Sequence, residues 1–525
     1  MRKRIEEAVK AAGIEMPFSV ERPARMAHGD YSTNAALIAK TDARKLADKL
    51  KVEGVERIEA AGKFINFFLS REAILKKIQD TQIEPFHTGK KIMVEYTDPN
   101  PFKEFHIGHL MSNAIGEAIA RLLERSGARV IRANYQGDVG PHVAKAIWGK
   151  LQKPDLGWGE AYAYGAREYE VHKDEIDELN KKIYKISPPA EVGDPQISAL
   201  YDAGRKESLE HFEEIYKKLG TKFDYYFFES ETGRRGLEIV KRHPEIFEES
   251  EGAVVFRGEH TRVFVTKWGL PTYEAKDLGL AEMKKEKAKF DQSITVTANE
   301  QDAYFRVVLE ALERVHPEWK GQFRHVSHGM MRFAEGKMSS RKGNVITGES
   351  LLEELKERAR GRMDVAVGAI KYAVLRQGSG RDIIFDPEKS LSLEGDSGPY
   401  LQYARVRAAS LLREAAKHGI AAFGTEAEDR WRSRPLGQVQ PTPIGPLERL
   451  LVHYPDALAR AAREMEPHYL TTYLTELAGV FNSWYARERV IGGENPQMGV
   501  FLATAAERAL HEGLDALGIP VPEEM

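Results

Sequence analysis

The sequence predicts an α/β protein whose central domain is a split, doubly wound parallel sheet. Residues 91–135 read as a strand, an amphipathic helix and a second strand, which is the pattern of a βαβ unit. Alternating strands and helices return after residue 256, and the chain beyond residue 387 is almost all helical in pattern. We therefore expect a Rossmann-like core with a small α+β N-terminal domain, an inserted domain and an all-α C-terminal bundle.

The N-terminal stretch predicts a small α+β module. Ile5, Val9 and Ala12 recur at helical spacing, and the aromatic-rich residues 63–69 (KFINFFL) are typical of a strand. The predicted domains are residues 1–85 (N-terminal module), 86–150 (first half of the core), 151–256 (insertion), 257–386 (second half of the core) and 387–525 (helical bundle).

The first half of the core has the most regular pattern. Residues 91–97 (KIMVEYT) predict a strand, and apolar residues at helical spacing between Ile107 and Leu123 predict a helix. Gly127 stands where a left-handed helix stop is expected, and residues 128–135 (ARVIRANY) predict the next strand.

The insertion and the second half of the core follow. Polar and aromatic helices with a proline-rich loop at residues 187–195 are expected in the insertion. In the second half of the core, the sequence pattern predicts strands at 262–267, 293–298 and 323–328, with helices at 273–289 and from Asp302. A proline-rich loop at 435–446 interrupts the C-terminal helices.

Composition limits the possible functions. The 525 residues include 77 Lys and Arg against 80 Asp and Glu, a formal net charge of −3, so a nucleic acid would have to bind local basic patches. There is no cysteine, which excludes disulfides, thiolate zinc sites and cysteine nucleophiles. No apolar run is long enough to span a membrane, and acidic residues follow the basic start where a signal peptide needs an apolar core. We expect a cytoplasmic protein without a membrane partner.

The first candidate site is residues 99–110 (PNPFKEFHIGHL), between the first core strand and its helix. His106 and His109 share one face of the first helical turn, and Gly108 leaves room for a base or ribose. The helix N-terminus and Lys103 supply positive potential for phosphates. Taken alone, this motif is as compatible with two incidental histidines as with a phosphate site.

The second candidate site is the segment 337–344 (KMSSRKGN), after the last core strand. A run of Lys, Ser, Arg and Gly suits a clamp over a polyphosphate. Alone, it is more typical of a solvated basic turn.

Together these motifs resemble the paired HIGH and KMSKS signatures of the class I aminoacyl-tRNA synthetases. The stretch VEYTDPNPFKEFHIGHL is similar to the arginyl-tRNA synthetase version, as are NYQGDVG with Asn134 and Asp138, and the segment from Pro271 to Leu278. HGDYSTNAALIAK near the start and GDSGPYLQYARVR and FNSWYARERVI near the end resemble that family's N-terminal and anticodon-binding domains. Three positions depart from the pattern: Asp98 is often Ser, Ser340 replaces a second Lys, and Val139 replaces a Trp.

The resemblance implies a set of functional residues. Arginine would be bound by Glu95, Asn100, Tyr273, Asp277 and Gln301, and ATP by His106, Gly108, His109, Lys337, Met338, Ser339 and Ser340. His106, His109, Lys103 and Lys337 would be catalytic. Transfer RNA would contact Asn66, Phe68, Asp396, Tyr400, Arg407 and Met525.

Physical chemistry supports part of this set. A guanidinium favours a carboxylate with two parallel hydrogen bonds, and Tyr273 and Asp277 share one face of a predicted helix. On its own, Asp277 would be interpreted as an acid near a helix N-terminus. Tyr400, Tyr403, Arg405, Arg407 and Arg413 interleave aromatic and basic side chains, as suits unstacked anticodon bases.

The implied activity is an arginine–tRNA ligase. It would form arginyl-adenylate from L-arginine and ATP, with Mg²⁺ as the counterion of ATP, and transfer arginine to the terminal ribose of tRNA-Arg. The resemblance also implies that activation needs bound tRNA. We expect no zinc, because the pair His325 and His328 has no third ligand in sight, and we expect a monomer.

Three alternatives stay open. The chain could be a class I synthetase for another amino acid, although cysteine would need zinc-binding thiolates and glutamate a basic pocket. It could be a non-catalytic tRNA-binding paralogue, which the intact His106, His109 and Lys337 argue against. An adenylyltransferase with an HxGH loop would not need the long helical C-terminus.

Overall fold

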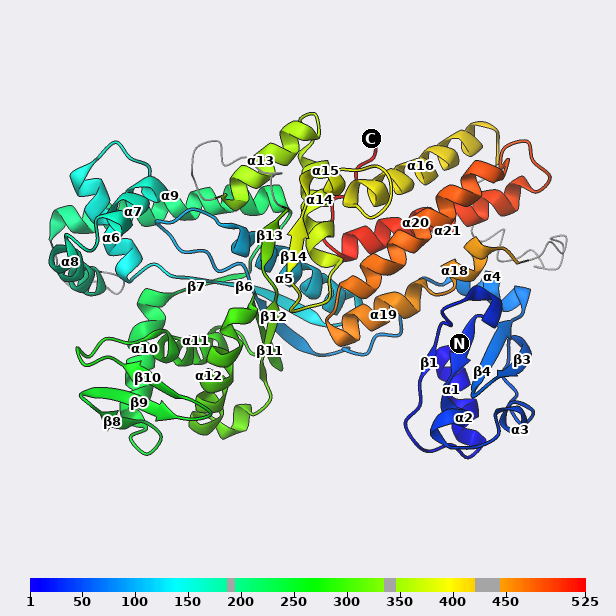
Figure 1. The fold of residues 1–525 in the computed structure, drawn as a ribbon, viewed down its shortest axis with the longest axis horizontal. Coiled ribbons are helices and arrows are strands. Elements are labelled where there is room, and N and C mark those ends of the chain that lie inside the picture. The colour runs from blue at the N-terminus through cyan, green and yellow to red at the C-terminus, as the bar shows by residue number, and fades with distance from the viewer. Residues whose placement is uncertain (187–193, 335–345, 421–443) are drawn as a thin grey trace.

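A computed structural model describes residues 1–186, 194–334, 346–420 and 444–525 (Figure 1). The N-terminal module is an antiparallel sheet in the order β1-β2-β4-β3 with helices packed around it, as predicted. The buried Ile5 and Val9 lie on its first helix. Its elements are α1 (Arg2–Ala11), β1 (Val20–Glu21), η1 (Met26–His28), β2 (Tyr31–Thr33), α2 (Ala35–Ile38), α3 (Ala43–Ala47), β3 (Val55–Ala61), β4 (Phe64–Leu69) and α4 (Arg71–Gln79).

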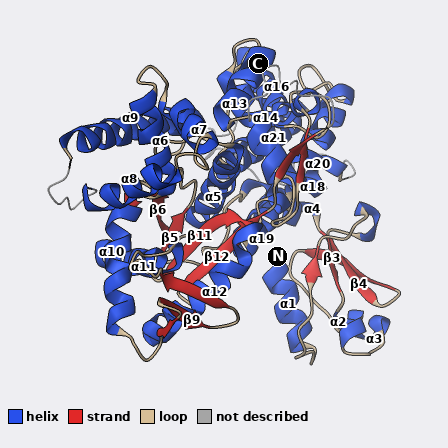
Figure 2. Ribbon diagram, turned by 60° about the vertical axis from the view of Figure 1, so that its left-hand side comes forward, coloured by secondary structure: helices blue, strands red, loops and turns tan. Residues whose placement is uncertain are grey.

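The central sheet has five strands in the order β12-β11-β5-β6-β7, and every neighbouring pair is parallel. The doubly wound prediction is therefore confirmed (Figure 2). The strand order reverses between β5 and β11, so a crevice for ligands is expected at the carboxyl ends of these two strands. The strands are β5 (Lys91–Glu95), β6 (Arg129–Gln136), β7 (Tyr225–Phe228), β11 (Gln292–Ala298) and β12 (Phe323–His328).

Helix α5 (Ile107–Arg125) connects β5 to β6 and is the central helix of the molecule. Most of its residues are buried, because it packs on the sheet and also against the C-terminal helices. It ends as predicted, with Gly127 in the left-handed region at φ +94°. The helices α11 (Tyr273–Lys287) and α12 (Asp302–Val315), with η3 (Pro317–Trp319), form the second half of the core.

Two sequence predictions about the core were wrong. Residues 225–228 were placed in the insertion but form the edge strand β7, because a four-residue aromatic run among charged helices has too little pattern to reveal a strand. Residues 262–267 were placed in the core sheet. They form β10 (Thr261–Val265) of a separate antiparallel sheet with β8 (Glu248–Ser250) and β9 (Ala253–Arg257). The sequence pattern of a single strand does not tell which of the two sheets it joins.

The insertion is a helical unit between β6 and β7 with its own apolar core. It comprises α6 (Pro141–Gln152), α7 (Trp158–Arg167), α8 (Lys173–Ile186) and α9 (Pro195–Leu219), and α10 (Glu229–Arg242) follows β7. The predicted loop at 187–195 lies mostly outside the described residues.

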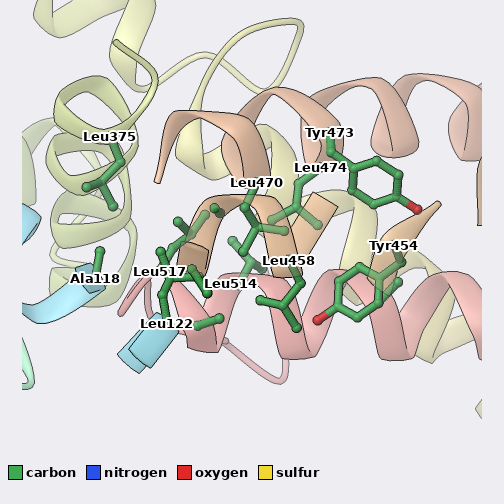
Figure 3. Packing of buried hydrophobic residues seen from close by; sticks show 14 of the residues in the cluster. Ala118, Leu122, Leu375, Tyr454, Leu458, Leu470, Tyr473, Leu474, Leu514 and Leu517 are labelled. Carbon is green, nitrogen blue, oxygen red and sulfur yellow. The ribbon is translucent and has the colours of Figure 1, made fainter. Parts of the chain in front are cut away.

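The C-terminal part is helical, as predicted, and shares its core with α5. Leucines of α14 and α19–α21 pack together with Ala118 and Leu122 of α5 (Figure 3). No helix within the described ranges is long and apolar enough to cross a lipid bilayer. The elements are β13 (Met331–Phe333), which pairs with β14 (Ile383–Phe385), and α13 (Gly348–Arg358), α14 (Met363–Leu375), α15 (Pro387–Ser390), α16 (Gly398–Lys417), α18 (Pro446–Leu451), α19 (Tyr454–Glu464), α20 (His468–Arg487) and α21 (Pro496–Ala516).

The N-terminal module sits against this helical part and away from the central sheet (Figure 1). Tyr31 donates a 2.6 Å hydrogen bond to Asp456, and Arg449 forms a 2.6 Å ion pair with the fully buried Asp30. A buried carboxylate needs such a partner, so these contacts fix the module on the bundle.

Candidate active site

The loop after β5 forms one wall of the crevice at the switch point. Thr97 and Asp98 have positive φ angles of 81° and 47°, which are costly for residues other than glycine. The Asp98 carboxylate accepts a 2.7 Å hydrogen bond from Tyr135 N on β6, and Asn113 donates to Thr97 Oγ1 at 3.0 Å. Asp98, whose role the sequence left open, thus fastens the strained loop to the neighbouring strand.

His106 and His109 lie where that loop enters α5. Their rings stack with centroids 3.4 Å apart, which confirms the predicted shared face. Gly108 N donates to His106 Nδ1 and His106 N donates to His109 Nδ1, so in the neutral rings Nε2 carries the proton. Burial and the nearby Lys103 lower the pKa of His106, and burial, His106 and Lys103 lower that of His109 strongly. The pair therefore presents neutral N–H donors near pH 7.

Gly108 makes this arrangement possible. A Cβ at position 108 would come within 3.0 Å of the His106 ring, which folds back over the helix start. The space that the sequence suggested for a base or ribose at Gly108 is thus taken by the His106 imidazole.

The segment that carries Lys337, Met338, Ser339 and Ser340 lies outside the described residues. The chain that follows it is hydrogen-bonded to the start of α5: Thr347 forms a β-bridge with His106, and Gly348 N donates to Phe105 O at 2.8 Å. Lys103 lies half-buried beside them, with Nζ 4.8 Å from the centre of the Tyr162 ring.

The residues expected to bind arginine gather at the start of α11 and the ends of β5 and β11. Asp277 is half-buried and accepts a 2.6 Å hydrogen bond from Tyr304, a residue that the sequence did not indicate. Burial raises the pKa of Asp277 to about 7; Tyr304 and Lys284 lower it, while Glu95 and Glu229 raise it. Tyr273 is 59% exposed and Gln301, at the end of η2 (Asn299–Gln301), is exposed at the rim.

Glu95 and Asn100 lie deeper in the crevice. The Glu95 carboxylate forms a 2.7 Å ion pair with Lys284 and accepts a 3.1 Å hydrogen bond from Thr295. The Asn100 side chain lies over the backbone of Gly137 so closely that no Cβ would fit there. Lys284 was missed, although it stands seven residues after Asp277 and so on the same face of α11.

Two other motif residues from the core have structural contacts. Asn134 is buried on β6 and donates to Tyr96 O. The buried Asp138 accepts hydrogen bonds from Tyr201, Arg205 and Ser230. Asp138 therefore joins the insertion to the sheet.

The anticodon candidates lie on and around α16. The Arg407 guanidinium packs on the Tyr403 and Tyr485 rings and donates to Asn482, while Tyr400 stays half-buried beside Gly479. Arg405, which was expected in the same interleaved surface, is 5% exposed and pairs with Glu507 and the C-terminal Glu523. It is a structural anchor of the C-terminus. Asp396 pairs with Arg376, and Met525 is 38% exposed.

The N-terminal candidates are buried. Asn66 and Phe68 are 5% and 9% exposed on β4, and Arg57 covers the Phe68 ring at 3.8 Å. This placement favours a packing role, so their contact with tRNA stays a prediction.

The histidine pair on β12 makes other contacts. His325 lies against Thr297 and Asp302 and stacks on Phe305, and His328 hydrogen-bonds Gly329 O. Within the described ranges, no three potential metal ligands gather in one place.

Comparisons with known proteins agree with this architecture. Residues 71–365 match a model described as "tRNA synthetases class I (R), catalytic domain". Residues 1–69 match "Arginyl tRNA synthetase N terminal domain", and residues 401–525 match "DALR anticodon binding domain".

Curated relatives match this chain over nearly the whole length of both sequences. The arginine–tRNA ligase of Limosilactobacillus reuteri is 31% identical over 97% of this chain and 96% of its own length, and that of Clostridium perfringens is 30% identical over 100% and 99%. The arginyl-tRNA synthetase structure of Thermus thermophilus has the same fold, with a TM-score of 0.81 over 100% of this chain and 99% of that one at 24% identity. The chain belongs to the arginyl-tRNA synthetase family of class I aminoacyl-tRNA synthetases.

Proposed function

We propose that this chain is an arginine–tRNA ligase that joins L-arginine to tRNA-Arg at the expense of ATP. The observation that carries the proposal is Asp277, a half-buried carboxylate that lines a cavity with Glu95 of β5 and Thr295 of β11, the two strands at the switch point of the sheet. A guanidinium is planar and permanently charged, and such a carboxylate can hold it with two hydrogen bonds. Tyr273 and Gln301 would close the pocket around the side chain.

The first step is the attack of the arginine carboxylate on the α-phosphorus of ATP, which releases pyrophosphate. Such a displacement needs positioning and charge stabilisation more than covalent help from the protein. We assign the phosphates to the positive N-terminal end of α5, to the Nε2–H donors of His106 and His109, and to Lys103 and Lys337. Mg²⁺ would arrive with ATP, held mainly by the phosphates.

The second step is transfer of the arginyl group to the terminal ribose of the tRNA. We assign the anticodon loop to the surface of Tyr400, Arg407, Asp396 and Met525, in the range that matches the anticodon-binding model or just before it. We also propose that the enzyme acts in the cytoplasm and as a monomer; one chain carries matches to the catalytic and anticodon-binding models, so neither step calls for a second copy.

The test is ATP–pyrophosphate exchange with each of the standard amino acids, with and without tRNA-Arg. Of the standard amino acids, we expect only arginine to support exchange, and we expect it to do so only when tRNA-Arg is present. Exchange with another amino acid would reassign the pocket to a different class I specificity. Binding of tRNA without any exchange would make the chain a tRNA-binding paralogue.

A double variant tests the phosphate site. His106→Ala with His109→Ala should slow adenylate formation and leave tRNA affinity within a few-fold. Near-normal exchange in the double variant would remove the histidines from the ATP site.

A further inference from the structure

Lys284 is a buried lysine at the amino-acid pocket that no motif indicated. Its side chain and that of Glu95 are both 3% exposed, and their charged atoms are 2.7 Å apart. Thr295 donates to the other Glu95 oxygen at 3.1 Å, while the oxygen that faces Lys284 makes the ion pair but no hydrogen bond. Burying two charges costs desolvation free energy, and a buried ion pair is often no more stabilising than apolar residues in its place. We therefore expect a functional role for this pair.

The pair faces the same internal space as Asp277. A cavity of about 30 Å³ is lined by Glu95, Asp277, Lys284, Thr295 and Arg324 on its polar side and by apolar residues of α11, α12 and β12 on the other. Because the Glu95 and Lys284 side chains are each only 3% exposed, these charges act on one another more strongly than they would in water.

The charges around Asp277 leave room for one more cation. Glu95 and Lys284 pair with each other, Arg324 lines the space from the exposed face of β12, and the hydrogen-bond partner of Asp277 is the neutral Tyr304. A guanidinium bound beside Asp277 would supply its counter-charge. Without Lys284, Glu95 would lose its partner and both carboxylates would compete for that guanidinium.

We propose that Lys284 is the positioning residue of the amino-acid pocket, which holds Glu95 in place and leaves Asp277 as the carboxylate that receives a monocationic side chain. The proposal rests on the arginine–tRNA ligase function given above. Lys284 acts through the two carboxylates and does not itself contact the substrate.

The titration of Asp277 gives this role a measurable consequence. The pKa of Asp277 is about 7, raised mainly by burial and held down in part by Lys284, so removing the ammonium should raise it further. More Asp277 would then be protonated at pH 7, and arginine would bind more weakly until the pH is raised. The other groups that face Asp277 are Glu95 of β5, Asp98 of the following loop, Tyr135 of β6, Glu229 of α10, Tyr304 of α12 and, across the cavity, Arg324 of β12.

The experiment is aminoacylation of tRNA-Arg between pH 6 and pH 9 by the wild type, Lys284→Met, Lys284→Gln and Lys284→Arg. In the Met and Gln variants we expect the midpoint of kcat/KM for arginine to move up by about one pH unit. At pH 7 about half of Asp277 is ionised when its pKa is about 7, and about a tenth when the pKa is one unit higher. The shift therefore lowers kcat/KM for arginine roughly fivefold at pH 7, in addition to any loss that does not depend on pH. Lys284→Arg should restore the midpoint, and kcat/KM for ATP should keep its wild-type pH profile.

Lys285→Met is the matched control. Lys285 is the next residue of α11 and is also partly buried, but its Nζ bonds the Phe290 carbonyl and the Gln322 side chain and faces no carboxylate of the pocket. It should lower the melting temperature without moving the midpoint.

The outcomes are separable. If the wild type does not charge arginine, the proposed function fails and Lys284 is not at issue. If the wild type is active and the Met and Gln variants lose activity equally at every pH, Lys284 is only a structural lysine and the proposal is wrong. A Met variant too unstable to assay leaves the Gln variant to decide.

Discussion

If Asp277 binds the arginine side chain, as proposed, its titration sets how arginine recognition depends on pH. Its pKa is raised to about 7 by burial, and the carboxylate is the form that binds a guanidinium. Raising the pH through 7 therefore increases the binding-competent fraction. We expect kcat/KM for arginine to rise about tenfold per pH unit below the pKa and to level off above it. Steady-state aminoacylation at saturating ATP and tRNA measures this.

The histidines provide the internal control for that profile. Their pKa values are lowered, so both rings stay neutral while Asp277 titrates. We expect kcat/KM for ATP to stay nearly flat between pH 6.5 and pH 8. Parallel profiles for arginine and ATP would mean that a group shared by both substrates is titrating.

Removal of the Asp277 charge should abolish arginine selectivity. In Asp277→Asn the shape and one acceptor remain, but a buried guanidinium would lack its counter-charge, which costs about 2–5 kcal/mol, or roughly 30- to 5,000-fold in kcat/KM. Tyr273→Phe should cost less, because Tyr273 is 59% exposed and only its hydroxyl is lost. Charging with arginine and with the uncharged analogue citrulline compares the two. An Asn variant that still discriminates them as the wild type does would show that the pocket lies elsewhere.

At the scale of elements, α5 links the active site to the helical part of the molecule. Its first turn carries His106 and His109, and near its other end Arg121 and Arg125 pair with Asp515 of α21 at 2.9 Å and 2.7 Å. The buried Lys371 of α14 adds hydrogen bonds to Leu219 O and Gly518 O beside this junction. The start of α5 is thus set by the loop after β5 and its end by the bundle.

The packing of α5 should be sensitive to one added methyl group. Gly116 faces the Tyr96 ring so closely that no Cβ fits without movement of the ring or the helix. We expect Gly116→Ala to lower the free energy of unfolding by about 1–3 kcal/mol, because overpacking exceeds the gain in helix propensity. Gly479→Ala on α20, where the nearest atom is 3.6 Å from the new Cβ, should be neutral or slightly stabilising. Urea denaturation of both variants measures the difference, and equal stabilities would contradict the tight contact.

The elements with a long periodic pattern could be predicted from sequence, and the short or ambiguous ones could not. Residues 107–123 hold an apolar stripe that only a helix satisfies, and the spacing of His106 and His109 fixed their shared face. Lys284 was missed because a lysine in a run of lysines and glutamates resembles a solvated face. Only the packing of α11 on the sheet reveals that it is buried. The strand β7 and the separate sheet of β10 were missed because local pattern does not tell which strands pair.

At the scale of the whole molecule, the N-terminal module and the helical bundle form one side of the protein. The module contacts α18 and α19 through Asp30, Tyr31 and Lys77. Asp30 is fully buried, and breaking its pair with Arg449 would leave a charge without a cation. The N-terminal module and the helical bundle are therefore held in a fixed relative position, so a tRNA that contacts both would meet a surface of fixed geometry.

Binding of tRNA should depend on local cations, since the chain as a whole is slightly acidic at −3. Lys and Arg contacts to phosphates release counterions, so we expect affinity for tRNA-Arg to fall steadily as salt is raised.

Arg407→Ala and Tyr400→Ala should weaken tRNA binding, by about 1–3 kcal/mol if each supports a stacked base, because Arg407 is held over the Tyr403 and Tyr485 rings. Lys417→Ala, at the far end of α16 and paired with Glu414, removes a charge without touching that surface and should change affinity little. The measurement is tRNA binding over a salt series, with arginine-dependent exchange at saturating tRNA as the check that the pocket is intact. If Lys417→Ala weakens binding as much as Arg407→Ala, the tRNA recognises diffuse charge, and the anticodon surface lies elsewhere on the bundle.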